Sequence, residues 1–330
     1  MISAHHFRAS STRPVRSFVG VLAVLLLTIG LTACQSSGDE SEGDEAVETT
    51  TPPVVDVTAV DYAFMAPDTI PSGWVTLRMK NKGEETHYFQ LDRLRLPDGR
   101  SFADFKEAAL EPADSLGQLR DAGKIDSAEA RKALDEIVPE WVPRSGVMGG
   151  KGGGMPLLAP GRTARVTLKM EPGIYVMRCH AVKTPDGRRH SDLGMERGIT
   201  VTEASTGASP PEPDVTIRVS GHEVTTEGQF QAGRQIGAYH VEEASEGMDD
   251  YYWSAMLARI ESDKALNNLR AYIEEGSIRN PVPVEYVGGF EYLSPGDTAY
   301  AELDLVPGRY AWHIHGQQDT VTTFTVEDAK

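Results

Sequence analysis

One loop near the middle of the chain carries three side chains that could bind a metal. Cys179, His190 and Met195 stand within YVMRCHAVKTPDGRRHSDLGM, which spans residues 175–195. A thiolate, an imidazole and a thioether together suit a transition metal that accepts soft ligands. The residues fit a second interpretation as well, because a lone cysteine at a strand end is often a small buried hydrophobic side chain. His190 and Met195 would then belong to an unrelated polar turn.

An internal repeat predicts which elements position this loop. LAPGRTARVTLKMEPGIY begins at Leu158 and LSPGDTAYAELDLVPGRY begins at Leu293, and nine of their eighteen positions are identical. Each copy contains a Pro-Gly turn, an alternating strand, a second Pro-Gly turn and another strand. We therefore expect a mainly β protein with two tandem Greek-key β-sandwich domains, the second being a copy of the first.

The N-terminal residues form a short apolar segment that ends at a cysteine. Arg8, Arg13 and Arg16 precede FVGVLAVLLLTIGLTA at 18–33, and Cys34 follows at once. The segment is too short and too abruptly ended for a comfortable membrane-spanning helix. Small residues before a cysteine resemble the bacterial lipobox, which implies cleavage before Cys34 and lipidation of its thiol, for example with palmitate. A secretory peptide that leaves a free thiol, and an uncleaved anchor helix, are the alternatives.

The composition predicts where the domains begin and end. The polar and acidic segment after Cys34 buries too little apolar surface to offset its ordering entropy, so we expect it to be a disordered tether. The expected order is a signal peptide with a lipobox at 1–33, the tether at 34–53, a first β-domain at 54–203, a linker at 204–212 and a second β-domain at 213–330.

Short helical insertions are expected within both domains. DSAEARKALDEIV begins with Asp126 and Glu129 in the spacing of a capping box, and SDKALNNLRAYIEE begins with Ser262 as a helix cap. GVMGGKGGGMP at 146–156 is expected to be a mobile surface connection. It does not fit a phosphate-binding loop, because its lysine is not followed by Ser or Thr.

The first domain resembles the cupredoxin family over roughly 54–203. The resemblance rests on NKGEETHYFQL around His87, on the LAPG and EPGIYVMRC segments before Cys179, and on HSDLGM, which ends at Met195. It implies a β-sandwich with one copper in a type 1-like site, held by His87, Cys179, His190 and Met195. The thiolate and the two imidazoles would form a trigonal site, and the thioether would bind weakly along its axis.

The sequence departs from the blue copper pattern between two of these implied ligands. Ten residues separate Cys179 from His190, more than blue copper proteins usually have. The insertion contains TPDG, which favours a type I turn, so a hairpin could return His190 to the site. The insertion could equally leave the loop too loose to bind copper. The long loop ending in Gly-Met is similar to that of some cupredoxin-like bacterial lipoproteins and secreted proteins.

The second domain is expected to be a degenerate copy without this copper site. Alignment of the repeats places Ile314 at the position of Cys179, and Trp253 at the position of His87. The residues after His315 leave no room for a second loop with a histidine and a methionine. We expect apolar side chains to fill the equivalent place.

The other histidines argue against a multicopper oxidase. Five remain outside the signal peptide and the implied site, fewer than a trinuclear copper cluster needs: His180, His222, His240, His313 and His315. Strand alternation predicts that His180, His313 and His315 point away from the Cys179 side, toward water. A copper reductase with a site between the domains is a third hypothesis, and the sequence motifs of common hydrolases are missing.

The leading prediction is a membrane-tethered lipoprotein outside the cytoplasm that uses copper for electron transfer or copper holding, without turning over a substrate. Its partners would be a membrane, through the lipid, and a redox or copper-donor protein. Gln35, directly after Cys34, resembles the residue that directs bacterial lipoproteins to the outer membrane. The protein would then lie on the periplasmic side or the surface side of that membrane. The chain has 32 Lys and Arg against 49 Asp and Glu, which argues against nucleic acid as a partner. The alternative is a metal-free binding or structural module of the cell envelope.

Overall fold

The computed structural model describes residues 50–142, 151–220, 223–242, 253–275, 278–315 and 320–328. Within it, Glu48–Lys330 forms one compact unit. The expected signal peptide, the expected lipidation site Cys34 and residues 34–49 of the expected tether lie outside the described residues. The predicted boundaries at 54–203, 204–212 and 213–330 stay predictions.

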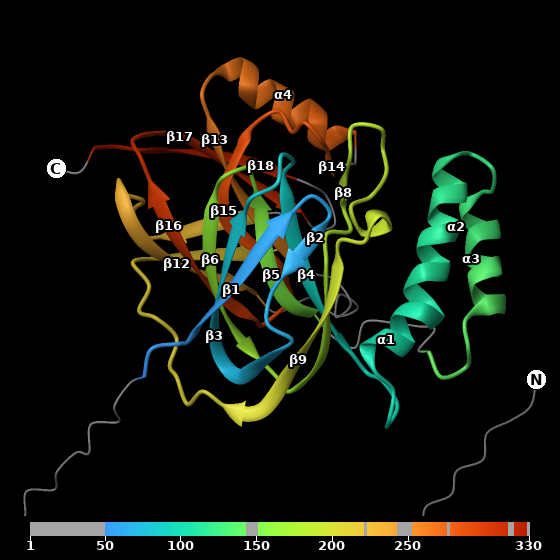
Figure 1. Ribbon diagram of the computed structural model, residues 1–330. Helices are drawn as coiled ribbons and strands as arrows, with labels where there is room; N and C mark the ends of the chain where they lie inside the picture. The colour runs from blue at the N-terminus through green and yellow to red at the C-terminus, as the bar shows by residue number, and fades with distance from the viewer. Residues whose placement is uncertain are drawn as a thin grey trace, which may run out of the picture. The chain divides into compact units, whose positions relative to one another are not determined.

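The first repeat is a sandwich of two sheets that share one long strand (Figure 1). One sheet contains β1 (Val54–Val60), β2 (Ala63–Met65), β3 (Thr69–Asn81) and β6 (Thr163–Met170). The other contains β9 (Glu196–Ser205), β7 (Gly173–Arg178), β4 (His87–Leu94) and β5 (Lys151–Leu158). The start of β3 pairs with β9, and the rest pairs with β1 and β6. Val75, Leu77 and Met79 alternate into the core along β3, as the two-residue period of a strand requires.

The second repeat has the same arrangement of strands. Its sheets contain β10 (Val215–Ser220), β11 (Glu223–Glu227), β12 (Gly233–Val241) and β16 (Thr298–Leu305), and β13 (Trp253–Ile260), β15 (Glu285–Leu293), β17 (Gly308–His315) and β18 (Thr320–Val326). The parallel pair β10–β12 matches β1–β3, and β13 lies between β15 and β17 as β4 lies between β5 and β7. The prediction of a mainly β chain with two tandem sandwiches is confirmed.

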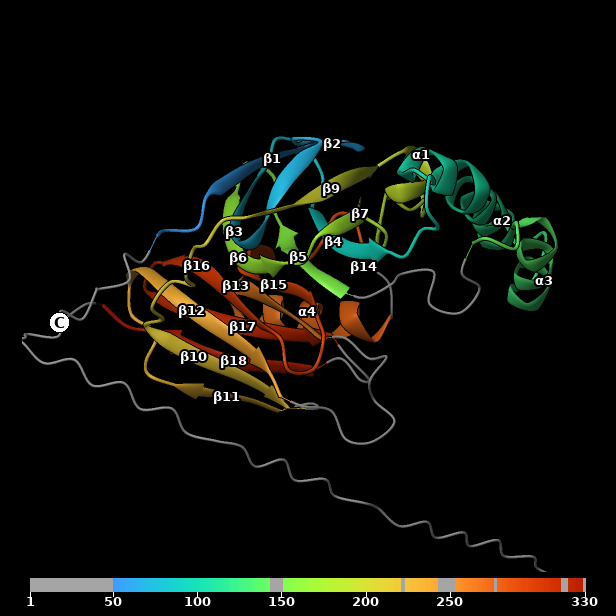
Figure 2. The ribbon, with the colours of Figure 1, turned by 90° about the horizontal axis from the view of Figure 1, so that it is seen from below.

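The two repeats meet through equivalent strands, whose layers are seen from below in Figure 2. β6 pairs antiparallel with β16, and Val166 lies directly opposite Ala301. These residues occupy the same position in the two sequence copies. β5 and β15, which are also equivalent, are in contact. The same surface of each repeat therefore contacts its counterpart, as in a two-fold symmetric dimer.

The helices are insertions at the same place in both repeats. Between β4 and β5 lie α1 (Phe102–Phe105), the π-helical segment η1 (Lys106–Leu110), α2 (Glu111–Asp121) and α3 (Ser127–Ile137). Between β13 and β15 lies α4 (Asp263–Glu274). The predicted capping box of Asp126 and Glu129 is present, and Ser262 caps α4 by accepting the Ala265 N–H. Both helix predictions are confirmed.

The prediction for the glycine-rich segment is wrong where it can be checked. Residues 151–156 belong to β5, whereas 146–150 lie outside the described residues. A Cβ atom on Gly154 would lie 2.2 Å from the Phe89 carbonyl oxygen, and one on Gly152 would lie 2.6 Å from the Tyr175 ring. The glycines are there because neighbouring groups approach the backbone too closely for a side chain.

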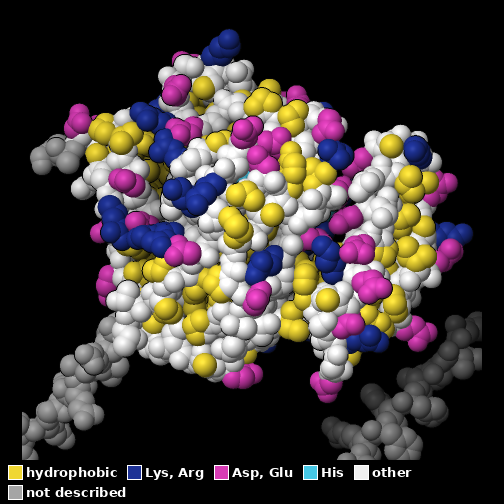
Figure 3. All heavy atoms as spheres, viewed as in Figure 1, with side chains coloured by type: hydrophobic (Ala, Val, Ile, Leu, Met, Phe, Trp, Pro, Cys, Tyr) yellow, Lys and Arg dark blue, Asp and Glu magenta, His cyan; other side chains and the backbone are white. Residues whose placement is uncertain are grey.

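The surface shown in Figure 3 carries acidic and basic side chains interspersed with hydrophobic ones. Several basic side chains gather on the left of this view with acidic ones among them, and Arg165 and Arg234 both pair with Glu302.

An ionic cluster attaches the helical insertion to the sheet beside the predicted metal loop. The Arg178 guanidinium lies 3.5 Å from Asp114 of α2 and 3.3 Å from Glu196 of β9. Lys106 of η1 lies 3.3 Å from the second oxygen of Glu196. The side chains of Arg178 and Glu196 are buried, so these charges compensate each other in a poorly hydrated place.

We expect Asp114 to make stability depend on pH. Burial raises the pKa of Asp114 to about 6, against the opposing effect of Arg178. The folded state then holds this proton more tightly than the unfolded state, so the stabilisation is full below about pH 4 and is lost as pH rises through about 6. Urea unfolding from pH 4 to 7 should show wild type losing roughly 1–3 kcal/mol relative to Asp114→Asn.

A matched change on the surface serves as the control for this experiment. Asp98 is exposed in the loop before α1, and Asp98→Asn should follow the wild-type pH profile. Parallel profiles for Asp114→Asn and wild type would contradict the prediction.

Candidate metal centre

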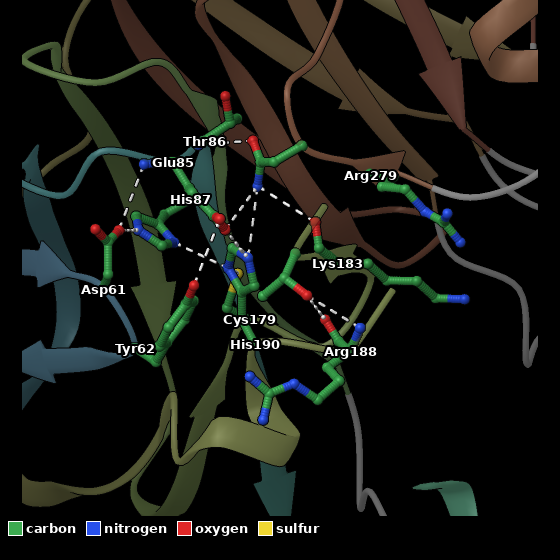
Figure 4. Close-up of polar contacts among 12 residues, drawn as sticks. Asp61, Tyr62, Glu85, Thr86, His87, Cys179, Lys183, Arg188, His190 and Arg279 are labelled. Carbon is green, nitrogen blue, oxygen red and sulfur yellow. Dashed lines mark hydrogen bonds and ion pairs between the residues drawn. The ribbon is translucent and has the colours of Figure 1, made fainter. Parts of the chain in front are cut away.

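Three of the four predicted ligands bring their donor atoms together in the first repeat (Figure 4). His87 begins β4, Cys179 follows the end of β7, and His190 lies at the end of the inserted hairpin. Their donor atoms all lie within 4.8 Å of one another, and all three side chains are fully buried. His190 Nδ1 is 3.0 Å from His87 Nδ1 and 3.4 Å from Cys179 Sγ.

The long insertion folds into a hairpin, which is one of the two alternatives that the sequence left open. The Thr184 N–H donates to the Arg188 carbonyl at 2.8 Å, and the Gly187 N–H donates to the Thr184 carbonyl at 2.9 Å, which closes the turn. The His190 N–H then donates to the Val182 carbonyl at 3.0 Å. The insertion therefore returns His190 to within reach of Cys179 instead of loosening the loop.

Backbone hydrogen bonds attach Met195 to two of the other predicted ligands. The Met195 N–H donates to the His190 carbonyl at 3.0 Å, and the Cys179 N–H donates to the Met195 carbonyl at 3.1 Å. Gly194 has φ +99°, a left-handed conformation that glycine adopts without strain, and it allows this tight return. Met195 is fully buried beside the three donors.

Two carboxylates hold the outer nitrogens of the histidine rings. Asp61 Oδ1 lies 2.6 Å from His87 Nε2, and Glu85 Oε2 lies 2.7 Å from His190 Nε2. A carboxylate accepts, so each Nε2 carries the hydrogen and each neutral ring keeps a lone pair on Nδ1. Two Nδ1 lone pairs that face each other at 3.0 Å repel unless a cation lies between them. The site therefore fits a metal ion.

Burial also prepares the donors electrostatically. Desolvation lowers the pKa of His190 to about 3, with a further contribution from His87, and desolvation also lowers the pKa of His87. Both rings are therefore neutral, which is the form that binds a metal. Desolvation raises the pKa of the Cys179 thiol, so a metal cation is needed to displace its proton in this environment.

Sequence reasoning missed the residues that surround the histidines. Asp61 lies in the turn after β1, where its carboxylate also accepts the Glu84 N–H at 2.9 Å. Tyr62 places its ring edge-on to His190 at 5.1 Å between centroids. Of these residues, Glu85 is the one that the sequence could have indicated. It stands two residues before the predicted ligand His87, and an acidic side chain so close to a ligand can reach the site.

The second repeat fills the equivalent position with apolar side chains. β4 and β7 pair Leu91 with Met177, whereas β13 and β17 pair Leu257 with Trp312. Counting along the strands from these pairs gives the correspondences that the sequence alignment predicted: Trp253 for His87 and Ile314 for Cys179. Both Trp253 and Ile314 are buried.

The prediction that His313 faces water is wrong. Its side chain is 2% exposed, and its Nδ1 lies 3.0 Å from the Tyr286 hydroxyl. His313 is paired with Met256 of β13, which is buried as well, and so are the neighbouring Ala255 and Leu257. Both faces of this sheet are therefore covered, whereas alternation alone treats one of them as exposed. His180 is half-buried, and desolvation lowers its pKa to about 3.

Fold and site together define a class. The described residues form two tandem β-sandwiches, and His87, Cys179, His190 and the adjacent Met195 are the donor set typical of a type 1 copper site. No helix in the described part of the chain is both long and apolar enough to cross a membrane.

Comparison with known proteins gives similarity only among solved structures. No family model and no curated protein matches the sequence. Dithionite-reduced auracyanin from the photosynthetic bacterium Roseiflexus castenholzii is 19% identical, over 47% of this chain and 98% of that one, with a TM-score of 0.25. Auracyanin A, a blue copper protein from Chloroflexus aurantiacus, is 18% identical over 46% and 99%, also with a TM-score of 0.25. A multicopper oxidase is 12% identical over 83% and 88%, with a TM-score of 0.20.

We expect Gly83→Ala to damage the site without removing a donor. The added Cβ would lie 2.2 Å from Asp61 Oδ1 and 2.7 Å from His87 Nε2, so it would separate the carboxylate from the ring. Loss of such an outer partner typically weakens metal binding about 10- to 100-fold, which competition with a Cu(II) chelator would measure.

Gly117→Ala is the matched control for this substitution. Gly117 lies in α2, and a Cβ there would meet its nearest neighbour, an Arg189 nitrogen, at an ordinary 3.6 Å. This variant should bind copper as wild type does. Equal affinities for Gly83→Ala and Gly117→Ala would refute the steric argument.

Proposed function

We propose that this chain is a membrane-anchored, cupredoxin-like lipoprotein that binds one copper ion for electron transfer or copper holding. One observation carries the proposal: three buried donor atoms from His87, Cys179 and His190 converge within 4.8 Å. The three residues come from distant parts of the sequence, and their polar groups would be costly to bury without a cation. A metal-free binding or structural module does not account for this convergence.

The residues of the chain would hold copper in one geometry. When bound, copper supplies a one-electron couple between Cu(I) and Cu(II), whose ligand preferences the thiolate and imidazoles both satisfy. The hydrogen bonds among Cys179, His190 and Met195 fix the loop, and the sandwich core fixes β4 and β7. A rigid donor set limits rearrangement between the two oxidation states, which suits electron transfer.

Enclosure of the site favours the holding role within the same proposal. The rings of both His87 and His190 are fully buried, and their outer nitrogens contact carboxylates instead of water. A carrier needs a short path from the copper to its partner, whereas a holding protein benefits from slow release. The rate of electron exchange, compared with the rate of copper release to a chelator, distinguishes the two roles.

We expect the soluble chain from Gln35 onward to bind one Cu(II) and develop an intense visible thiolate-to-copper band. Cys179→Ser removes the sulfur donor and should abolish this band while the fold is retained, as monitored by circular dichroism. Ile314→Val, at the equivalent place of the second repeat, should leave the band unchanged. Silent optics with an intact wild-type fold would favour the metal-free module, and turnover of nitrite or oxygen would favour a copper reductase.

The anchor is supported by the sequence around Cys34. We expect the full chain to fractionate with membranes and to incorporate labelled palmitate. Cys34→Ser should abolish labelling, because the thiol that carries the lipid is lost. Cys179→Ser makes the same chemical change at the other cysteine and should keep the label. A wild-type chain that fractionates with membranes but takes up no label would instead indicate an uncleaved anchor helix.

A further inference from the structure

The insertion between Cys179 and His190 docks on the second repeat. Its strand β8 (Val182–Lys183) pairs in parallel with β14 (Ile278–Arg279), which lies between α4 and β15. The Asn280 N–H continues this pairing by donating to the Lys183 carbonyl at 2.9 Å. The residues that lengthen the loop thus connect the metal centre to the other half of the protein.

The side chain of Asn280 lies at the edge of the metal centre, within 3.5 Å of the His190 ring. Asn280 as a whole is only 6% exposed to solvent. Its Oδ1 accepts the Thr86 N–H at 3.0 Å, and its Nδ2 donates to Glu85 Oε2 at 3.2 Å and lies 3.5 Å from His190 Nε2. The second repeat therefore contacts both the His190 ring and the carboxylate that holds this ring.

Glu85 is held from several sides at once. One carboxylate oxygen faces His190 Nε2 at 2.7 Å and Asn280 Nδ2, and the other accepts the Tyr62 hydroxyl at 3.4 Å. Only 16% of its side chain is exposed. A fixed carboxylate determines which ring nitrogen carries hydrogen and how the ring is oriented, so it directs His190 Nδ1 toward Cys179.

We propose that Glu85 and Asn280 are positioning residues of the copper site, and that the second repeat completes and encloses the site in the first. The inference rests on the proposed copper function and gives the degenerate repeat a role. Trp253 and Ile314 fill its own equivalent position, yet its Asn280 closes the outer edge of His190. The carboxylate charge of Glu85 stabilises Cu(II) more than Cu(I), because the attraction scales with the charge of the ion.

The test compares two substitutions with matched surface controls in the chain from Gln35 onward, which contains the whole compact unit Glu48–Lys330. Glu85→Gln removes the charge at nearly the same shape, and Glu84→Gln makes the same change on an exposed neighbour. Asn280→Ala removes the contact of the second repeat, and Asn268→Ala makes the same change on the exposed side of α4. Each variant is titrated with Cu(II), and its reduction potential and its rate of copper loss to a chelator are measured.

We expect Glu85→Gln to weaken Cu(II) binding by about 10- to 100-fold, as loss of an outer ligand partner typically does. With Cu(I) binding unchanged, this raises the reduction potential by about 60–120 mV for a one-electron couple. Glu85→Asp keeps the charge and should restore part of the affinity. Asn280→Ala should weaken Cu(II) binding about tenfold and speed copper loss by a similar factor. The two control variants should match wild type.

The possible failures can be told apart. A wild-type chain that gives no visible band with Cu(II) refutes the copper function itself. A wild-type band together with unchanged affinity, potential and release rate in Glu85→Gln and Asn280→Ala refutes only the positioning role. Melting of the metal-free variants separates unfolding from a change at the site, and if Glu85→Gln does not fold, Asn280→Ala and Glu85→Asp decide the question.

Discussion

The metal centre depends on the direction in which two buried imidazoles face. Asp61 and Glu85 bind the outer nitrogens of His87 and His190, and this leaves both inner nitrogens as acceptors directed at one place. Cys179 adds a thiol whose ionisation is suppressed by burial. Two buried acceptor nitrogens directed at each other are unfavourable without a cation between them. The packing and hydrogen bonds of the surrounding fold must offset this free-energy cost. Most of the features around the site can be understood as ways of holding these rings.

The duplication explains how one chain maintains this arrangement. The repeats join through β6 and β16 at equivalent positions, so the interface is that of a two-fold pair although the copies have diverged. The first copy has a long loop between β7 and β9, whereas β17 ends at His315 and its antiparallel partner β18 begins at Thr320. Each copy thus has the sandwich, and among the described residues the cluster of His and Cys donors lies in the first copy.

The long loop and the second repeat fit together physically. A loop of this length costs conformational entropy to order, and a free excursion would position His190 poorly. Two sets of hydrogen bonds offset that entropic cost: those within the turn at Thr184, and those between β8 and β14 of the second repeat. Asn280 then reaches Glu85, so the contact that orders the loop also buttresses the ligand. The departure from the usual blue copper spacing and the presence of a second sandwich have one common explanation.

The sequence by itself determined the local and repetitive features. Pro-Gly turns and alternating residues predicted the sandwiches, the shared motif predicted the duplication, and the capping residues Asp126 and Ser262 predicted two helices. Resemblance to cupredoxins supplied the four candidate ligands in order. These features are readable because turns, caps and strand periods depend on residues close together in the chain.

Only the tertiary structure decided what lies around those features. Asn280 lies nearly two hundred residues from Glu85, and Asp61 reaches His87 across a separate strand, so no local pattern could connect them. His313 is buried on a sheet face that alternation alone leaves open to water, where its Nδ1 meets the Tyr286 hydroxyl. The glycines of β5 look like a loop in the sequence, but close contacts with Phe89 and Tyr175 require them in a strand. Long-range packing determined each of these features. The burial of a side chain, and its contacts beyond its own strand or loop, depend on elements that are distant in the sequence.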